Sequence, residues 1–173
     1  MGNSGSISLR RNPFDGILAR ISRDCEGNPH QKGIIEITTS SKGPRTIIEI
    51  DAILDPKNEH EWVSANEQNS WIQFDFKEKR IKLENYAIMT FSGQQGSTHM
   101  KSWRLEASED DIEWVILDDV KDDNTLNSSN AVITRATKTD QFYRYFKFTQ
   151  TDKNQFGTYC MAIRRIEFFG VLQ

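Results

Sequence analysis

Residues 71–76, Trp71-Ile72-Gln73-Phe74-Asp75-Phe76, decide the fold that we expect this chain to adopt. Apolar residues at positions 72, 74 and 76 alternate with polar residues at 73 and 75. This period of two is expected when one face of a strand is buried and the other faces water. The segment just before it, Trp62-Val63-Ser64-Ala65-Asn66, reads as a loop that brings a second tryptophan close to the strand. Together they predict a β-sandwich that serves as a binding module.

The chain before this strand is predicted to contain one helix and further strands. Asn12 can cap a helix that begins at Pro13, and Gly27 can end it. The apolar residues at 14, 17, 18 and 21 share one face of this helix, which we expect to plug one end of the sandwich. From Gly33 onward the pattern is that of strands, with apolar pairs at 35 and 37 and, after the turn at 43–44, at 48 and 50.

The chain after this strand is predicted to be almost entirely β. In the last strand the apolar parity changes at Arg164-Arg165, which indicates a β-bulge. Arg144 shares parity with the phenylalanines of its strand, so its guanidinium is expected to be partly buried beside an acidic partner. The spacing favours an antiparallel sandwich over alternating β-α units. The predicted strands are 81–91, 102–108, 112–117, 131–136, 142–150 and 161–170.

Composition limits the classes of function. The chain of 173 residues fits one domain, and its net charge of −3 comes without a cluster of lysines and arginines. Nucleic-acid binding normally leaves a basic footprint, so no nucleic-acid partner is expected. No apolar run is long enough to cross a membrane, and the first 25 residues lack the apolar core of a secretory signal. We therefore expect a soluble, cytoplasmic protein without a transmembrane segment.

Residues 1–11 are small and polar and then basic, which is typical of a flexible tail, and the folded domain is expected to span residues 12–173. Gly2, with a serine at position 6, also matches the myristoylation pattern. One acyl chain with Arg10 and Arg11 would tether the protein to a membrane only weakly. The plain tail is the favoured interpretation, and lipidation of Gly2 is the alternative.

The sequence contains little that indicates catalysis. Cys25 and Cys160 are too few for a disulfide framework and lack metal-site spacing, so reduced, partly buried thiols are expected. The three histidines stand far apart, and the common nucleophile and phosphate-binding motifs are missing. Two acids from distant loops remain an open route to a glycosidase. No cofactor is expected, except that Asp51 or Asp55 with backbone carbonyls could hold a structural Ca²⁺. Ordinary turn aspartates are the favoured interpretation.

Taken in order, several segments resemble the discoidin family, also called the coagulation factor 5/8 type C domain, a galactose-binding-like fold. The resemblance covers residues 12–172 and looks closest to an intracellular branch found in protist and other multidomain proteins. The matching segments are 14–18, Gly27-Asn28 with His30 and 32–38, 62–76, 99–108, Trp114, 142–154 and 166–170.

The resemblance implies an all-β, antiparallel jelly-roll sandwich of about eight main strands, with the short helix added at its N-terminal side. It also implies a binding module and not an enzyme, with glycans, phospholipid head groups or proteins as ligands. Extracellular members commonly join the two chain ends by a disulfide, whereas Cys25 and Cys160 lie away from the ends. Lipid-binding members carry apolar spikes on their end loops, whereas the loop at 92–98 is polar, so membrane insertion is disfavoured.

By the same resemblance, the binding end is built from the loops at 58–69, 92–101 and 151–159. These loops combine flat aromatic faces with amide donors, which suits the apolar face and the hydroxyls of a sugar ring. Each residue also has a structural interpretation, as a packing or loop-stabilising group. The predicted ligand-binding residues are Trp62, Asn66, His99, Asn154, Gln155 and Tyr159.

Two hypotheses for function follow. The first is a non-catalytic module that recognises a glycan or protein through its loop end. The second is a structural or scaffolding domain of an intracellular multidomain protein, without a small-molecule site. Exposed aromatic residues at the loop end would favour the first hypothesis, and a broad apolar patch on a sheet would favour the second.

Overall fold

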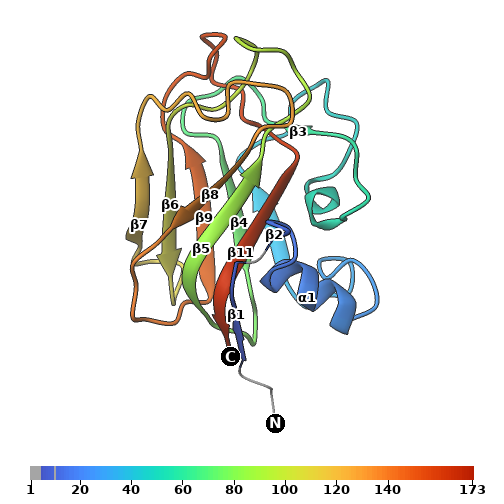
Figure 1. The fold of residues 1–173 in the computed structure, drawn as a ribbon, viewed down its shortest axis with the longest axis vertical. Coiled ribbons are helices and arrows are strands. Elements are labelled where there is room, and N and C mark those ends of the chain that lie inside the picture. Colours follow the sequence, from blue (N-terminus) through green and yellow to red (C-terminus); the bar gives the residue numbers. More distant parts are fainter. Residues whose placement is uncertain (1–4, 10) are drawn as a thin grey trace.

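The computed structural model describes residues 5–9 and 11–173 and shows two antiparallel sheets packed face to face, as the sequence predicts. One sheet has the strand order β1-β11-β5-β8 and the other the order β2-β4-β9-β6-β7, while β3 and β10 form a short separate pair (Figure 1). The elements are β1 (Gly5–Ile7), α1 (Ile17–Asp24), β2 (Glu36–Thr39), η1 (a 3₁₀ helix, Ile50–Leu54), β3 (Trp62–Val63), β4 (Trp71–Asp75), β5 (Ile81–Met89), β6 (Trp103–Ser108), β7 (Val115–Val120), β8 (Val132–Ala136), β9 (Tyr145–Gln150), β10 (Ala162–Ile163) and β11 (Arg165–Leu172).

The core lies between the two sheets and is rich in aromatic rings. The apolar face of β4 is fully buried, and the ring of Phe74 meets that of Phe168 on the opposite sheet at 5.2 Å between centroids, edge to face. Phe76 and Phe146 pack edge to face in the same way at 5.8 Å. Such aromatic pairs add about 0.5–1.5 kcal/mol each beyond the burial of their surface. The alternation in residues 71–76 therefore identified the centre of the core.

A buried polar chain ties the two sheets together on one side. The indole N–H of Trp103 donates to the Tyr86 hydroxyl at 2.8 Å, and that hydroxyl donates to Asp118 Oδ2 at 2.8 Å. Burial raises the pKa of Tyr86, so its phenol keeps its proton and remains a donor. Arg135 on β8 binds the same Asp118 carboxylate on β7, with its Nε at 2.5 Å from Oδ2. The two edge strands β7 and β8 are joined through this ion pair.

The helix differs from the prediction in its start and its position. Asn12 does not cap it; its side chain accepts the N–H of Phe14 at 2.9 Å in a local turn, and α1 begins only at Ile17. Gly16 precedes the helix, and a Cβ there would lie 2.4 Å from the carbonyl oxygen of Phe168. The helix packs against β11 and η1 on the flank of the sandwich and does not plug its end (Figure 1). The chain must pass closely over β11 before it can turn into the helix.

The predicted strand at 48–50 is wrong, because residues 48–49 belong to no strand and the 3₁₀ helix η1 begins at Ile50. Asp51 explains the difference: its Oδ2 accepts the side-chain amides of Asn28 at 3.2 Å and Gln31 at 2.8 Å. These bonds attach the first turn of η1 to the turn that follows α1. An alternation of only two apolar residues is too short to predict a strand where contacts with distant residues favour another structure.

The predicted bulge at residues 164–165 is also wrong in its cause. The parity changes because the chain leaves β10, which pairs with β3, and enters β11, which pairs with β5. The register shift of this strand lies instead between Phe169 and Gly170. Gly170 adopts φ +146°, and a Cβ there would lie 2.1 Å from the carbonyl oxygen of Lys82.

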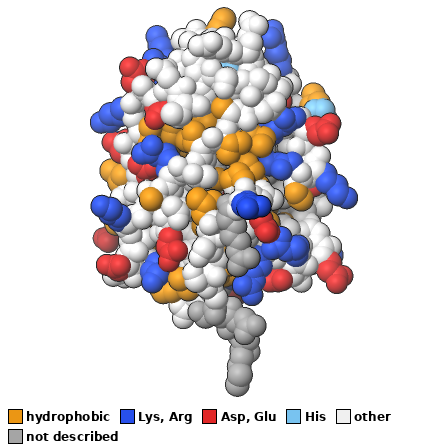
Figure 2. All heavy atoms as spheres, viewed as in Figure 1, with side chains coloured by type: hydrophobic (Ala, Val, Ile, Leu, Met, Phe, Trp, Pro, Cys, Tyr) orange, Lys and Arg blue, Asp and Glu red, His pale blue; other side chains and the backbone are white. Residues whose placement is uncertain are grey.

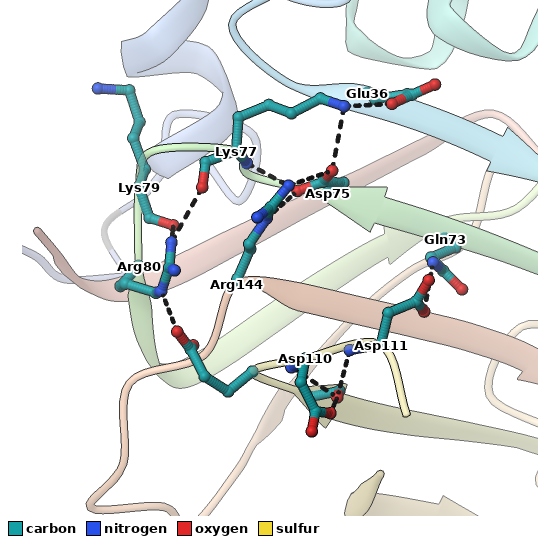
Figure 3. Close-up of polar contacts among 11 residues, drawn as sticks. Glu36, Gln73, Asp75, Lys77, Lys79, Arg80, Asp110, Asp111 and Arg144 are labelled. Carbon is teal, nitrogen blue, oxygen red and sulfur yellow. Dashed lines mark hydrogen bonds and ion pairs between the residues drawn. The ribbon is translucent and has the colours of Figure 1, made fainter. Parts of the chain in front are cut away.

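A network of charged residues lies at the end of the sandwich where β4 ends, at Asp75 (Figure 3). Arg144 donates to both carboxylate oxygens of Asp75, at 2.7 and 2.9 Å, which confirms the expected acidic partner. Lys77 Nζ lies 3.1 Å from the same carboxylate and also pairs with Glu36. Burial opposes ionisation of Asp75, but the bonds from Arg144 and Lys77 outweigh it and lower its pKa to about 2.

No helix in the described part of the chain is both long and apolar enough to cross a membrane. Gly2, the predicted lipidation site, lies outside the described residues.

Candidate ligand-binding site

Loops 58–70, 92–101, 121–131 and 151–161 gather at the end of the sandwich opposite the charged network, and we call this surface the loop end. Figure 1 shows the last three of these loops together at the top of the view. In Figure 2 this region is mostly uncharged, with basic and acidic side chains at its rim. The loop at 121–131 was not among those that the sequence assigned to the site.

Loop 151–161 lies in the middle of the loop end and is bonded to the loops on either side. The N–H of Gln155 donates to the carbonyl of His99 at 2.9 Å, and the Gln155 side chain donates to Asn124 Oδ1 at 2.9 Å. On the other side, the N–H of Tyr159 donates to Asn66 Oδ1 at 2.8 Å, and its hydroxyl accepts the amide of Gln68 at 3.1 Å. These bonds hold the loops in one arrangement, as a preorganised binding surface requires.

Three of the six predicted ligand-binding residues are buried. Trp62 is 1% exposed, His99 0% and Asn154 1%. Trp62 lies in β3 within the hydrophobic core. A ligand on this surface cannot contact these side chains, which instead support the loops from below. In the structure these three residues make the contacts of packing or loop-stabilising groups, which is the alternative that the sequence left open.

His99 holds loop 92–101 by three hydrogen bonds. Its Nε2 faces the carbonyls of Gly93 and Gln94 at 3.0 and 2.9 Å, so this nitrogen must carry the hydrogen. Nδ1 lies within hydrogen-bonding distance of the Thr90 hydroxyl, 2.9 Å away. The ring of Phe91 packs on the imidazole with 4.6 Å between centroids. His99 thus fixes the shape of this loop.

Asn154 performs the same task in loop 151–161. Its amide donates to Thr158 Oγ1 at 2.8 Å and to the carbonyl of Cys160 at 2.9 Å. Its Oδ1 accepts the N–H groups of Phe156 and Thr158 at 3.1 and 3.0 Å. All hydrogen-bonding capacity of this buried side chain is used within the loop, whose residues 156 and 157 are exposed.

Asn66, Gln155 and Tyr159 are the predicted residues that reach the surface, where Asn66 is exposed and the other two are half-buried. Asn66 and Tyr159 are joined by a hydrogen bond, whereas Gln155 is bonded on the other side of its loop, to Asn124. The structure adds two residues that sequence reasoning missed: Phe156, whose side chain is 70% exposed, and Lys153, whose Nζ lies 5.7 Å from the Tyr159 ring centroid. A phenylalanine inside the polar loop Asn154-Gln155-Phe156-Gly157 was the signal available in the sequence.

The two candidate calcium ligands lie elsewhere, at η1. Asp51 is buried with its Oδ2 bonded to amides, and Asp55 is exposed with its Oδ1 accepting the N–H of Lys57 at 2.8 Å. The carbonyl of Pro56 in the same loop accepts the guanidinium of Arg165. Among residues 5–9 and 11–173, no three side chains from His, Cys, Asp and Glu gather around one point. The Ca²⁺ site stays a prediction.

Comparison with known proteins places this geometry in a family. A sequence model of the F5/8 type C domain matches residues 36–164. No curated protein sequence gives a significant match. Many solved structures share the fold, and three of them illustrate the degree of similarity.

The module CpGH89CBM32-5 of Clostridium perfringens, solved in complex with GalNAc-β-1,3-galactose, has a TM-score of 0.63 at 16% identity, covering 80% of this chain and 96% of that one. The family 32 CBM of C. perfringens NanJ, solved with galactose, has a TM-score of 0.60 at 12% identity, with 82% and 96% covered. The C-terminal domain of a chitobiase from Bacteroides fragilis has a TM-score of 0.62 at 18% identity, with 82% and 97% covered. At these identities the likeness concerns the fold.

Proposed function

The chain belongs to the F5/8 type C domain family, and we propose that it binds a neutral glycan through the loop end described above. Membership of this family makes the chain a non-catalytic binding module. Two structural neighbours were solved with galactose or with GalNAc-β-1,3-galactose. Glycans that end in galactose are therefore the first ligands to test.

One observation carries this proposal: an exposed aromatic ring lies on a loop that amide side chains bond to its neighbouring loops. Phe156 is 70% exposed on the loop that also contains Tyr159 and Gln155. Burying so large an apolar ring against a ligand is favourable, and the apolar face of a pyranose is a suitable partner. Asn66 and Gln68 offer amide groups to the hydroxyls.

The polarity of the surface favours a neutral sugar over a charged one. The lysines of the loop end have partners in the chain: Lys101 pairs with Asp122 at 3.0 Å, and Lys153 lies near the Tyr159 ring. Besides the acidic residues Glu59, Glu61, Glu67, Asp122, Asp123 and Asp152, whose charge disfavours an anionic sugar, the loops contain many serine, threonine, asparagine, glutamine and glycine residues. Hydrogen bonds from such groups orient a neutral ligand without adding a strong preference for charge.

A glycan array probed with the purified domain tests the proposal. We expect galactose-terminated glycans to be retained, and Phe156→Ala to remove most of that signal. Ile112→Ala is the matched control, because Ile112 is 80% exposed but lies in the β6–β7 turn and outside the loop end. An array on which the folded wild type retains no glycan, or on which both variants behave alike, would contradict the proposal.

The scaffolding alternative rests on a different surface, the outer edge of β7. Ile112, Val115 and Ile116 are 80%, 43% and 55% exposed there, and among the described strands β7 pairs only with β6. An apolar, unpaired edge strand can accept another chain. If this edge is the functional surface, partners retained by the domain should be lost in Ile116→Lys and kept in Phe156→Ala.

We also propose a location inside the cell, in the intracellular branch that the sequence resembles. The supporting observation is that Cys25 and Cys160 are both free thiols in the structure. Fractionation of cells that express the tagged chain tests this location. Lipidation of Gly2 is a separate proposal, and the mass of the chain after co-expression with an N-myristoyltransferase decides it.

A further inference from the structure

A groove of about 850 Å³ lies between α1 and η1, on the flank of the sandwich and apart from the loop end. Its walls come from residues 12–15, from the helix and the turn that follows it (19–31), and from residues 48–57. The volume falls within the range of small-molecule sites in proteins, about 300–1,000 Å³. None of the loop-end residues contributes to it.

Most of the groove is apolar. Phe14 and Ala19 form one wall, and Ala52, Leu54 and Pro56 form the other. Phe14, Ala19 and Ala52 are half-buried and Leu54 is 7% exposed, so a ring placed between the walls would cover carbon atoms that now face water. Covering such surface contributes roughly 25 cal/mol per Å².

Asp51 supplies a charged point in this apolar groove. Its side chain is 8% exposed, and the amides of Asn28 and Gln31 both donate to the same oxygen, Oδ2. Among the described residues, no donor reaches Oδ1 and no lysine or arginine pairs with the carboxylate. Oδ1 is not sealed in the interior either. In the described chain, the side-chain nitrogen and oxygen atoms that are fully buried without a hydrogen-bond partner belong to Arg104, Gln150, Arg164 and Arg165, and not to Asp51.

The other charges of the groove leave Asp51 uncompensated. Asp15 is paired with Arg23 at 2.5 Å, and Glu49 is paired with Lys42. Asp55 and Lys57 are exposed at the far end. A carboxylate held in a largely apolar site gains most from a cationic hydrogen-bond donor, because charge-assisted bonds are roughly twice as strong as neutral ones.

We propose that the α1–η1 groove is a second ligand site, and that its ligand is a small organic amine. The ammonium group donates to Asp51 Oδ1, and an aromatic or aliphatic ring lies between Phe14 and the wall of Ala52 and Leu54. The site is independent of glycan binding at the loop end.

Titration of the ¹⁵N-labelled protein with tryptamine tests this proposal, because tryptamine joins an ammonium group to a flat ring. We expect saturable chemical-shift changes at the amides of Asn28, Gln31 and Ala52 and none at the loop end. Tryptophol, which carries a hydroxyl in place of the ammonium, should bind at least tenfold more weakly. Equal affinity for the two compounds, or no saturable change up to about ten millimolar tryptamine, would overturn the proposal.

Three variants locate the site. Asp51→Asn removes the charge and keeps an oxygen for Asn28 and Gln31, so tryptamine should weaken at least tenfold while tryptophol is unchanged. Ala52→Phe fills the groove and should block both compounds, which keeps the test decisive if Asp51→Asn folds poorly. Asp24→Asn removes one charge from α1 outside the groove and should change nothing. Tryptamine binding that survives both Asp51→Asn and Ala52→Phe would refute the site.

Discussion

Glu167 gives the sharpest prediction about stability, because this buried carboxylate on β11 caps the start of α1. It is 3% exposed, its Oε1 accepts the N–H groups of Leu18 and Phe168 at 2.8 and 2.9 Å, and its Oε2 accepts that of Ala19 at 3.1 Å. Two of these donors, Leu18 and Ala19, are free N–H groups of the first turn of α1. The third, Phe168, follows Glu167 on β11. A side chain distant in sequence thus performs the role that we predicted for Asn12.

Burial raises the pKa of Glu167 from 4.5 to about 7, although the N–H bonds favour the ionised form. Because the pKa is raised in the folded state, the folded protein holds the proton more tightly than the unfolded chain. Its contribution to stability is complete below pH 4.5 and is lost as the pH rises to about 7. This interval corresponds to a loss of ~3 kcal/mol in the free energy of unfolding.

Glu167→Gln, which cannot ionise, isolates this effect. At low pH the variant should be less stable than the wild type by about 1–3 kcal/mol, because one backbone N–H loses its acceptor. Between pH 4.5 and 8 the free energy of unfolding of the wild type should fall by ~3 kcal/mol relative to that of the variant, so that the two become equal or the variant becomes the more stable. Urea unfolding followed by tryptophan fluorescence at a series of pH values measures it. Glu84→Gln, at an exposed position of β5, is the control.

A difference between wild type and Glu167→Gln that stays constant, or grows, from pH 4.5 to 8 would refute this reasoning. That result would mean that the N–H groups at the start of α1 stabilise the carboxylate by more than burial costs.

Three further changes test the framework of the fold. Gly16→Ala should lower the free energy of unfolding by about 1–3 kcal/mol, since its Cβ would meet the Phe168 carbonyl at 2.4 Å, and a thermal melt measures this. Arg144→Met should cost about 1 kcal/mol at neutral pH; because the pKa of Asp75 is lowered to about 2, that cost should fade as the pH drops from 3.8 toward 2, and acid titration of both proteins checks it. His99→Ala should cost about 1–3 kcal/mol by leaving the Gly93 and Gln94 carbonyls without their donor; it should also speed hydrogen exchange in residues 92–98, and unchanged exchange there would contradict the role of His99.

The strands could be predicted from the sequence because the residues of a strand alternate between apolar and polar types according to which side chains are buried. In residues 71–76 the alternation alone identified the strand and its buried face, since a sheet buries every second side chain. Arg144 was likewise predicted to need an acid, because a half-buried guanidinium among phenylalanines must be paired. The sandwich itself needed only these local patterns and their spacing.

Features that depend on contacts between distant residues could not be predicted in this way. Asn12 has the right residue type to cap a helix, yet Glu167 on β11 does so. The alternation at 48–50 resembles a strand, yet Asp51 and its amide partners form a 3₁₀ turn.

The same limit explains why three of the predicted residues at the loop end are buried. Trp62, His99 and Asn154 were selected by residue type, and residue type does not show whether a loop side chain faces ligand or core. The loops themselves were placed correctly at one end, because loops between strands of a sandwich collect there. Phe156 was missed because a single phenylalanine in a β-rich chain is usually a core residue.

The most direct test of the central claim is isothermal titration of the wild-type domain and Phe156→Ala with GalNAc-β-1,3-galactose. We expect saturable binding to the wild type and about fivefold weaker binding to the variant, because the aromatic contact contributes about 1 kcal/mol. The melting temperatures of the two proteins should be equal, since Phe156 is exposed. Equal affinities of the two proteins for the disaccharide would contradict the claim that the loop end is the glycan-binding site.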